Sequence, residues 1–176
     1  MAELTESVAA SAPRQRRRIE FLLPTLIVIV DQVTKAMVRA SLPLYDSVTV
    51  IPGFLDFTHV LNTGAAFGFL DTIEFPYKTT LIAAIATIAL IGVSLYSASL
   101  SRHQLAARVG LALIVGGAAG NLVDRLMLGS VVDFVDVYWG SYHFWAFNVA
   151  DSAISVGVTI MLIDMLRTGN HVSTTV

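Results

Sequence analysis

The stretch from Thr79 to Leu100 constrains this sequence most, because it contains no charged residue. As a helix it would be about 33 Å long at about 1.5 Å per residue, which is enough to cross the hydrocarbon core of a bilayer. Three other apolar stretches of comparable length contain few charges, so the predicted spans are 19–40, 79–100, 105–128 and 148–167. Charged residues make up 14% of the chain, against about 25% in soluble domains. The sequence therefore predicts an all-α polytopic membrane protein with four transmembrane helices.

The predicted spans divide the chain into one membrane domain between two tails. The parts are residues 1–18, 19–168 and 169–176, with outer loops at 41–78 and 129–147 inside the second. The first part is polar and ends in a run of arginines, which favours a disordered cytoplasmic tail. Basic residues before an apolar stretch also occur in cleaved signal peptides, but the first span continues through Asp31 and Lys35, which the core of a signal peptide would not contain.

The distribution of basic residues predicts the orientation. Residues 40–77 and 129–147 contain no lysine or arginine. The opposite side carries Arg14, Arg16, Arg17, Arg18, Arg102, Arg108 and Arg167. The positive-inside rule therefore places both termini in the cytoplasm. Four acids then gather near the outer face, namely Asp31, Asp124, Asp133 and Asp151, and carboxylates in a membrane bundle are costly enough to indicate a functional site.

Composition argues against several other classes. No large basic face exists, which argues against a nucleic-acid partner. Cysteine is absent, so this chain has no disulfide, thiolate nucleophile or cysteine metal ligand. His59 and His143 lack the spacing of a metal-binding motif, so we expect no metal and no cofactor.

The first outer loop contains the pattern of a small hairpin. Pro52-Gly53, a pair typical of a type II turn, separates two runs rich in β-branched and aromatic residues within 47–61. Asn62 follows and can hydrogen-bond a peptide backbone, although the same residue types also form simple turns. Residues 71–77 are expected to form a short surface helix, and the second outer loop carries a cluster of aromatic residues that suits the membrane interface.

The acids differ in their neighbours. Asp31 and Lys35 are four residues apart on one helical face, where they can neutralise each other. Asp124 precedes Arg125, which would keep its carboxylate ionised. Asp133 and Asp151 have no adjacent cation in the sequence, so they are the better candidates for a catalytic pair. Two carboxylates in a poorly solvated site share a proton, so one can activate water while the other donates to a carbonyl oxygen, as in aspartic proteases.

The sequence resembles the bacterial lipoprotein signal peptidases, also called type II signal peptidases, a family of aspartic endopeptidases. Five blocks carry the resemblance in the order of the family: Asp31-Gln32-Val33-Thr34-Lys35, Asn62-Thr63-Gly64-Ala65-Ala66-Phe67, Gly120-Asn121-Leu122-Val123-Asp124-Arg125, Val132-Asp133-Phe134-Val135-Asp136 and Phe147-Asn148-Val149-Ala150-Asp151-Ser152. Each block alone is weak, but the ordered set is specific and extends from about Ile19 to Arg167.

The resemblance implies four transmembrane helices with a small extracytoplasmic β-cradle and a surface helix, in the bacterial inner membrane. It implies cleavage of a prolipoprotein just before its diacylglyceryl-modified cysteine, with membrane lipid around the substrate and inhibition by cyclic peptides such as globomycin. It implies that Asp133 and Asp151 are catalytic. The supporting residues for substrate or catalytic pair would be Asn62, Gly64, Asn121, Asp124, Arg125 and Asn148, whereas Asp31 and Lys35 would be structural.

Two other classes compete with a peptidase. Acids in a membrane also mark ion or proton pathways, but here they cluster at one face and no internal repeat is apparent. A non-catalytic scaffold would have no reason to place unpaired acids at converging span ends. Among peptidase mechanisms, a serine–lysine pair would have to use Lys35 or Lys78, and a zinc mechanism lacks its helical motif.

Overall fold

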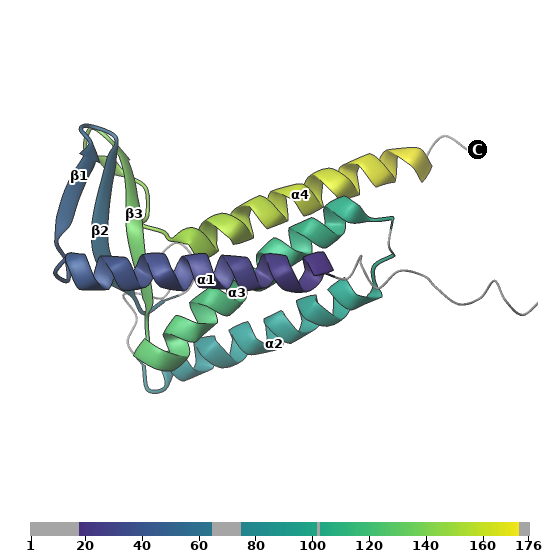
Figure 1. Ribbon diagram of the computed structural model, residues 1–176, viewed down its shortest axis with the longest axis horizontal. Helices are drawn as coiled ribbons and strands as arrows, with labels where there is room; N and C mark the ends of the chain where they lie inside the picture. The colour runs from purple at the N-terminus through teal and green to yellow at the C-terminus, as the bar shows by residue number, and fades with distance from the viewer. Residues whose placement is uncertain (1–17, 65–74, 102, 173–176) are drawn as a thin grey trace, which may run out of the picture.

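The computed structural model describes residues 18–64, 75–101 and 103–172, and within them it contains four long helices and a small antiparallel sheet at one end of the bundle (Figure 1). The helices are α1 (Arg18–Ser41), α2 (Lys78–Ser99), α3 (Leu105–Leu128) and α4 (Val149–Val172). The strands are β1 (Ser47–Ile51), β2 (Leu55–Asn62), β3 (Val131–Trp139) and β4 (Tyr142–His143). All four helices are long and apolar enough to cross a membrane, as predicted.

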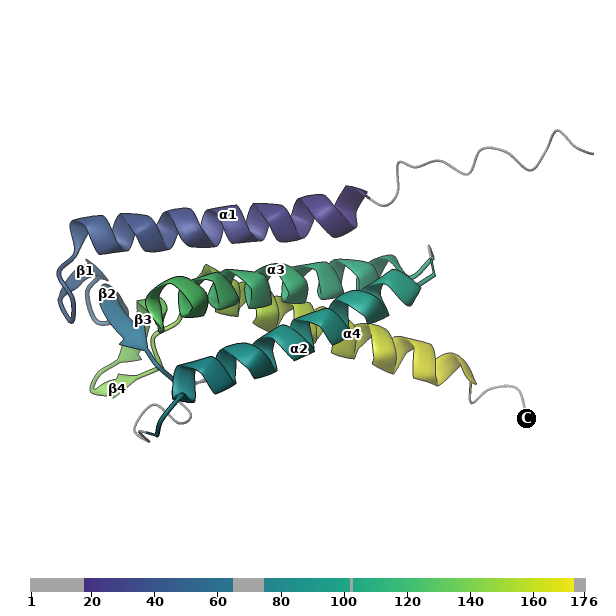
Figure 2. The same ribbon diagram turned by 90° about the horizontal axis from the view of Figure 1, so that it is seen from below.

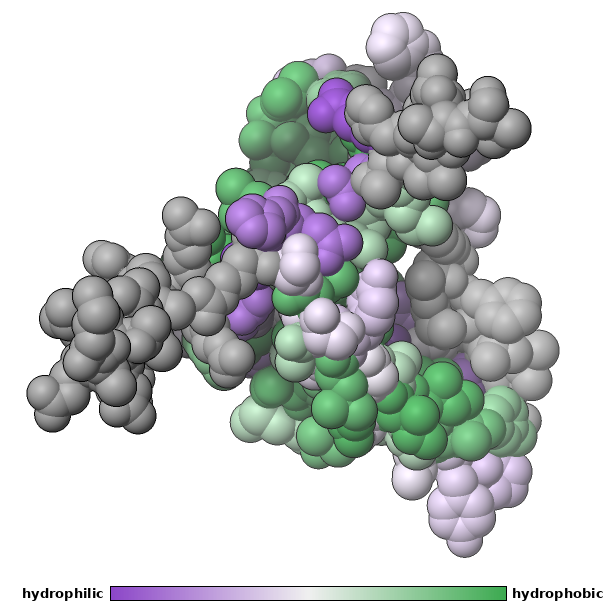
Figure 3. All heavy atoms as spheres, turned by 90° about the vertical axis from the view of Figure 1, so that its right-hand side faces the viewer, coloured by the Kyte–Doolittle hydropathy of each residue, from purple (hydrophilic) through white to green (hydrophobic). Residues whose placement is uncertain are grey.

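Helix α3 is the centre of the bundle and packs against the other three helices (Figure 2). In its span 50% of the residues are buried, against at most 17% in any other span. The outer flanks of the other helices expose apolar side chains such as Leu26, Ile88 and Leu162, which is what lipid-facing helices do. Seen end-on from the side opposite the sheet, hydrophobic residues cover the flanks and hydrophilic residues gather on the end of the bundle (Figure 3).

Glycines allow α3 to approach α1 and α4 closely. A Cβ on Gly116 would lie 2.9 Å from Cα of Pro24 and from Cβ of Ile27, both on α1. A Cβ on Gly117 would overlap the carbonyl oxygen of Ala150 at the start of α4. Small residues at a helix interface are the usual route to tight packing in membranes. Here they fix the start of α4 against the middle of α3.

The sheet has the strand order β1-β2-β3-β4 and includes a segment that the sequence pattern had indicated as an outer loop. Residues 131–139 form β3, which pairs with β2 so that Asn62 lies opposite Val131 and Val60 opposite Asp133. The outer loop predicted at 129–147 therefore contains the strands β3 and β4. The run VVDFVDVYW is rich in β-branched and aromatic residues, which fits a strand, but its partner lies about 70 residues earlier, so the neighbouring sequence does not indicate the pairing.

Other boundaries differ modestly from the prediction. Helix α4 continues to Val172, so the expected tail at 169–176 begins with helix. The N-terminal tail lies outside the described residues except for Arg18, which starts α1. Most of the surface helix expected at 71–77 also lies outside them, and residues 75–77 form a turn that leads into α2.

Candidate active site

The first turn of α4 positions Asp151. Asn148 precedes the helix, and its side-chain oxygen accepts a hydrogen bond from the backbone N–H of Asp151 at 2.9 Å. In return the Asp151 carboxylate accepts from the backbone N–H of Asn148 at 3.3 Å. This reciprocal arrangement is a capping box, which satisfies two backbone donors that a helix start leaves open. It also fixes the carboxylate of Asp151 at the positive end of the helix dipole.

Strand β3 supplies Asp133, and two amide side chains hold its carboxylate. Asn62, at the end of β2, donates to Oδ2 of Asp133 at 3.0 Å. Asn148 donates to Oδ1 of Asp133 at 2.7 Å. Asn148 therefore touches both acids, although they are 18 positions apart in the sequence. The predicted meeting of Asp133 and Asp151 at one end of the bundle has this direct structural basis.

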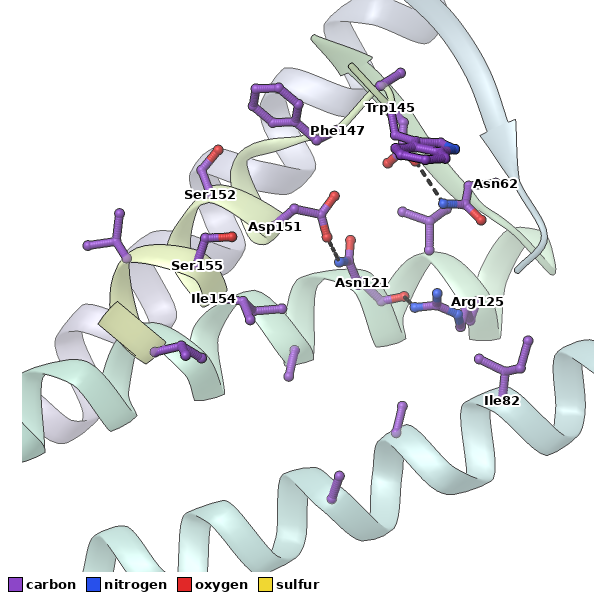
Figure 4. A pocket seen from close by; sticks show the side chains of 18 of the residues that line it. Asn62, Ile82, Asn121, Arg125, Trp145, Phe147, Asp151, Ser152, Ile154 and Ser155 are labelled. Atoms are coloured by element: carbon purple, nitrogen blue, oxygen red, sulfur yellow. Dashed lines mark hydrogen bonds between the residues drawn. The ribbon is translucent and has the colours of Figure 1, made fainter. Parts of the chain in front are cut away.

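Helix α3 contributes an amide and a guanidinium to the same site. Asn121 donates to the Asp151 carboxylate at 2.8 Å and accepts from the Asn148 side chain at 3.2 Å. Arg125 donates to the carbonyl oxygen of Gly64 at 3.0 Å, and the backbone N–H of Gly64 donates to the side chain of Asn62 at 2.9 Å. The close-up view shows Asn62, Asn121, Arg125 and Asp151 around one space (Figure 4).

Burial controls the protonation of Asp133. Its exposed fraction is 3%, and loss of water disfavours the charged carboxylate. Burial, together with the nearby charge of Asp151, raises the pKa of Asp133 to about 7, although the hydrogen bonds from Asn62 and Asn148 oppose the rise. A carboxyl group with this pKa exchanges its proton near neutral pH, which suits general acid–base chemistry.

A cavity of about 1070 Å³ opens onto the two acids. Its polar lining consists mainly of Asn62, Asn121, Arg125, Asp133 and Asp151. The remaining wall is mostly apolar, with Ile82, Ile85 and Ala89 from α2, Ile154, Val156 and Val158 from α4, and the segment 144–147. The space therefore combines a polar end, where peptide groups can be held, with apolar walls between two membrane-length helices.

Close to the two acids lies a buried ionic cluster formed by Asp31, Lys35 and Asp124. Lys35 pairs with Asp31 at 2.8 Å, as predicted from their spacing, and with Asp124 at 3.0 Å. The sequence had suggested that the adjacent Arg125 keeps the Asp124 carboxylate ionised, and the structure adds Lys35 as the cation that pairs with it. Neighbouring residues of a helix point about 100° apart and do not face each other. Arg125 turns instead toward Gly64 and the backbone of Asn121.

Three groups of residues near the site carried no clear signal in the sequence. Gln32 donates to both Asp31 and Asp124, at 3.2 and 2.9 Å. Lys78 is buried and contacts the Thr63 hydroxyl at 3.1 Å, beside Asn62. Phe144 and Phe147 line the cavity, and Phe147 pairs with β3 through Val135. Gln32 lies inside one of the five family blocks, but only the fold reveals what it touches.

The two histidines considered as metal ligands lie in separate settings. His59 is buried and its Nδ1 is 2.9 Å from the carbonyl oxygen of Leu42, whereas His143 is exposed and pairs with Asp136 at 2.8 Å. Within the ranges that the structure describes, no three His, Asp or Glu side chains are grouped as metal ligands. Asp136 lies on β3 but outside the cavity lining.

Four membrane-length helices with an acid-lined cavity at one end define a polytopic membrane protein whose site has the side chains of an aspartic peptidase. Comparison with known proteins identifies the family. The family model described as Signal peptidase (SPase) II matches residues 23–167, and the chain belongs to this family. The family predicted from the five sequence blocks is thereby confirmed, and the chain is a multi-pass membrane aspartic peptidase of the lipoprotein signal peptidase type.

Individual relatives match nearly their whole length. The lipoprotein signal peptidase of Geobacter metallireducens is 43% identical over 150 residues, which cover 85% of this chain and 91% of that protein. The lipoprotein signal peptidase of Syntrophotalea carbinolica is 42% identical over 152 residues, with coverages of 86% and 93%. A bacterial membrane enzyme solved at 2.3 Å resolution superposes with a TM-score of 0.78 at 34% identity, covering 89% of this chain and 93% of that one.

Proposed function

We propose that this enzyme removes the signal peptide from diacylglyceryl-modified prolipoproteins by cleaving just before the lipidated cysteine, with Asp133 and Asp151 as the catalytic pair. The relatives' name implies a prolipoprotein as substrate. The choice of these two residues rests on one observation: Asn148 hydrogen-bonds to both of them at the wall of the cavity. Among the described acids, only Asp133 and Asp151 line that cavity.

The surroundings of the two acids suggest different roles. Asp151 lies in the first turn of α4, where the helix dipole attracts negative charge, whereas Asp133 lies on strand β3. Asp133 has its pKa raised to about 7 by burial and by the charge of Asp151. We therefore assign the base to Asp151 and the shared proton to Asp133.

The reaction then needs only these two groups and one water. Asp151 takes a proton from the water as its oxygen attacks the scissile carbonyl carbon, and Asp133 gives its proton to the carbonyl oxygen, which yields a gem-diol. Asp151 next passes its proton to the leaving nitrogen as the C–N bond breaks. One gem-diol hydroxyl returns its proton to Asp133, which leaves a carboxylic acid, an amine and the original pair.

The cavity walls suit a substrate that is part peptide and part lipid-embedded. The amides of Asn62 and Asn121 and the guanidinium of Arg125 are close enough to the acids to orient a peptide backbone. The apolar walls formed by α2 and α4 suit an apolar signal segment and adjacent acyl chains. By the family resemblance, cyclic peptides such as globomycin would compete for this space.

The proposed location is the inner membrane, with both termini cytoplasmic and the sheet outside. The start of α1 and the end of α4 lie at one end of the bundle and the sheet at the other (Figure 1). The described outer segments 42–64, 75–77 and 129–147 contain no lysine or arginine, which fits the positive-inside rule.

The decisive experiment is a cleavage assay on a purified diacylated prolipoprotein in detergent micelles. Asp133→Asn and Asp151→Asn should each lower kcat by at least about 1,000-fold while the protein folds and binds substrate. Asp136→Asn on the same strand and Asp164→Asn on the same helix are the matched controls and should keep most of the activity. Substantial cleavage by either dyad variant, or loss of wild-type activity with a chelator, would overturn the proposed mechanism.

A further inference from the structure

Lys35 lies at the centre of a buried network that the proposed chemistry does not use directly. Its side chain is fully buried in α1, and an ammonium group has three N–H donors. All three have partners: Asp31 at 2.8 Å, Asp124 at 3.0 Å and Asn121 at 2.9 Å. Each partner in turn makes one hydrogen bond to the segment that carries a catalytic acid.

The first connection leads to Asp151. Oδ1 of Asp31 accepts a hydrogen bond from the backbone N–H of Ala150 at 3.0 Å. Ala150 immediately precedes Asp151 and is itself fully buried. A bond at this position fixes the peptide unit from which the Asp151 side chain departs, across a separation of 119 residues.

The second connection leads to Asp133 in the same way. Oδ2 of Asp124 accepts from the backbone N–H of Val132 at 3.1 Å. Val132 immediately precedes Asp133 and has an exposed fraction of 0%. The two carboxylates of the network therefore hold the residue before each catalytic acid, one on a helix and one on a strand.

The third connection acts on the carboxylate of Asp151. Lys35 donates to Oδ1 of Asn121, so the other end of that amide, Nδ2, must point away from the ammonium. This Nδ2 donates to Oδ1 of Asp151 at 2.8 Å. Lys35 thus fixes the orientation of the Asn121 amide as a donor to the catalytic acid.

All the carboxylate oxygens of this network have hydrogen-bond partners, so the network can be rigid. Every carboxylate oxygen of Asp31 and Asp124 accepts at least one hydrogen bond from Lys35, Gln32 or the two backbone amides. Gly120 leaves the room for it, because a Cβ there would lie 2.7 Å from Oδ2 of Asp31. Buried ion pairs of this kind contribute little net stability compared with apolar packing, so their presence favours a role in specifying geometry.

We infer that Lys35, through Asp31, Asp124 and Asn121, is a positioning residue that sets the separation and orientation of Asp133 and Asp151. The inference rests on the proposed function of that pair. Misplacement of reacting groups by about 1 Å can cost about 100-fold in rate. Loss of the network should therefore lower kcat about 10- to 100-fold and leave KM within about threefold, because the cavity walls that bind the substrate remain.

The test uses two variants of the full-length enzyme in detergent micelles. Lys35→Met removes the centre of the network but leaves the buried carboxylates of Asp31 and Asp124 without their cation, which by itself strongly destabilises the protein. The triple variant Lys35→Met/Asp31→Asn/Asp124→Asn removes all three charges together and keeps side-chain oxygens at both positions. We expect the triple variant to fold, as judged by its melting temperature, with the lowered kcat and unchanged KM. Hydrogen exchange at Val132 and Ala150 should be faster than in the wild type.

Glu20→Gln is the matched control. Glu20 pairs with the buried Arg108 at 2.8 Å and so joins the same two helices, α1 and α3, at the other end of the bundle. This variant should lose thermal stability but keep its kcat. Wild-type kcat in a folded triple variant would overturn the inference. A lowered kcat in Glu20→Gln would also overturn it, because loss of stability alone would then explain the effect. Cleavage by Asp133→Asn or Asp151→Asn would instead overturn the proposed function itself.

Discussion

Asn148 and Asp151 bind each other twice: the side chain of Asn148 accepts from the backbone of Asp151, and the side chain of Asp151 accepts from the backbone of Asn148. Here the amide nitrogen of Asn148 is left free to donate to Asp133, and it does so at 2.7 Å. Asn148, which caps α4, therefore also bridges the two acids. Its side-chain oxygen has the capping role, and its side-chain nitrogen makes the bond to Asp133.

Substitution of Asn148 should reveal these two roles independently. Serine is as good a helix cap as asparagine, so Asn148→Ala, which also loses the cap, should lower the free energy of unfolding by about 1–2 kcal/mol more than Asn148→Ser does. Both variants lose the donor to Asp133, so both should lower kcat/KM by about 10- to 100-fold. Thermal melting and initial-rate assays of the two proteins check this. Wild-type activity in the serine variant would mean that the bridge to Asp133 is dispensable.

The pH dependence of cleavage should report the proton on Asp133. Burial and the charge of Asp151 raise the pKa of Asp133 to about 7, with Asn62, Asn148 and Lys35 opposing the rise. If Asp133 donates this proton, kcat/KM should fall about tenfold per pH unit above about pH 7. Asn62→Ala removes a hydrogen bond that favours the ionised form, so its descending limb should move to higher pH. Asp136→Asn should leave the profile unchanged, and a profile flat to pH 9 would contradict the assignment.

The ionisation of Asp133 should also make the free energy of unfolding depend on pH. Because the pKa of Asp133 is near 7 in the folded protein and near 3.8 in the unfolded chain, the folded state binds the proton more tightly. The free energy of unfolding should therefore fall as pH rises from about 4 to about 7, by on the order of 2–4 kcal/mol from this group. Asp133→Asn removes that contribution. From pH 5 to pH 8, the melting temperature of the variant should rise relative to that of the wild type. A difference in melting temperature that stays constant over this pH range would exclude the effect.

Sequence patterns were sufficient for the parts of this fold that depend on local composition. The four spans follow from uninterrupted apolar stretches, and the Asp31–Lys35 pair follows from helical spacing. Orientation and loop length place Asp133 and Asp151 at the same end of the bundle, where the structure joins them through Asn148. These features need no knowledge of which strand pairs with which.

Other features depend on partners that are distant in the sequence. Residues 131–139 become a strand because β2 is available to pair with them. The sequence suggested Arg125 as the cation beside Asp124, but it gave no sign that Lys35, 89 positions earlier, pairs with Asp124 across the α1–α3 interface. The direct bonds from Asp31 to Ala150 and from Asp124 to Val132 follow from three-dimensional packing alone.

Two glycine substitutions should separate helix propensity from close packing. Gly92 lies on α2, and a methyl group added there would have no atom within 4 Å, so Gly92→Ala should be neutral or stabilise the enzyme by up to about 1 kcal/mol. Gly117→Ala makes the same change on α3, but its methyl group would overlap the carbonyl oxygen of Ala150 and press on Ile154 at 2.8 Å. Since a backbone carbonyl cannot move aside as a side chain can, α4 must shift where it carries Asp151. We expect Gly117→Ala to lose about 1–3 kcal/mol of stability and most of its cleavage activity, as measured by thermal melting and by kcat on a diacylated prolipoprotein. Equal behaviour of the two variants would show that the contact between α3 and the start of α4 does not control the position of the catalytic pair.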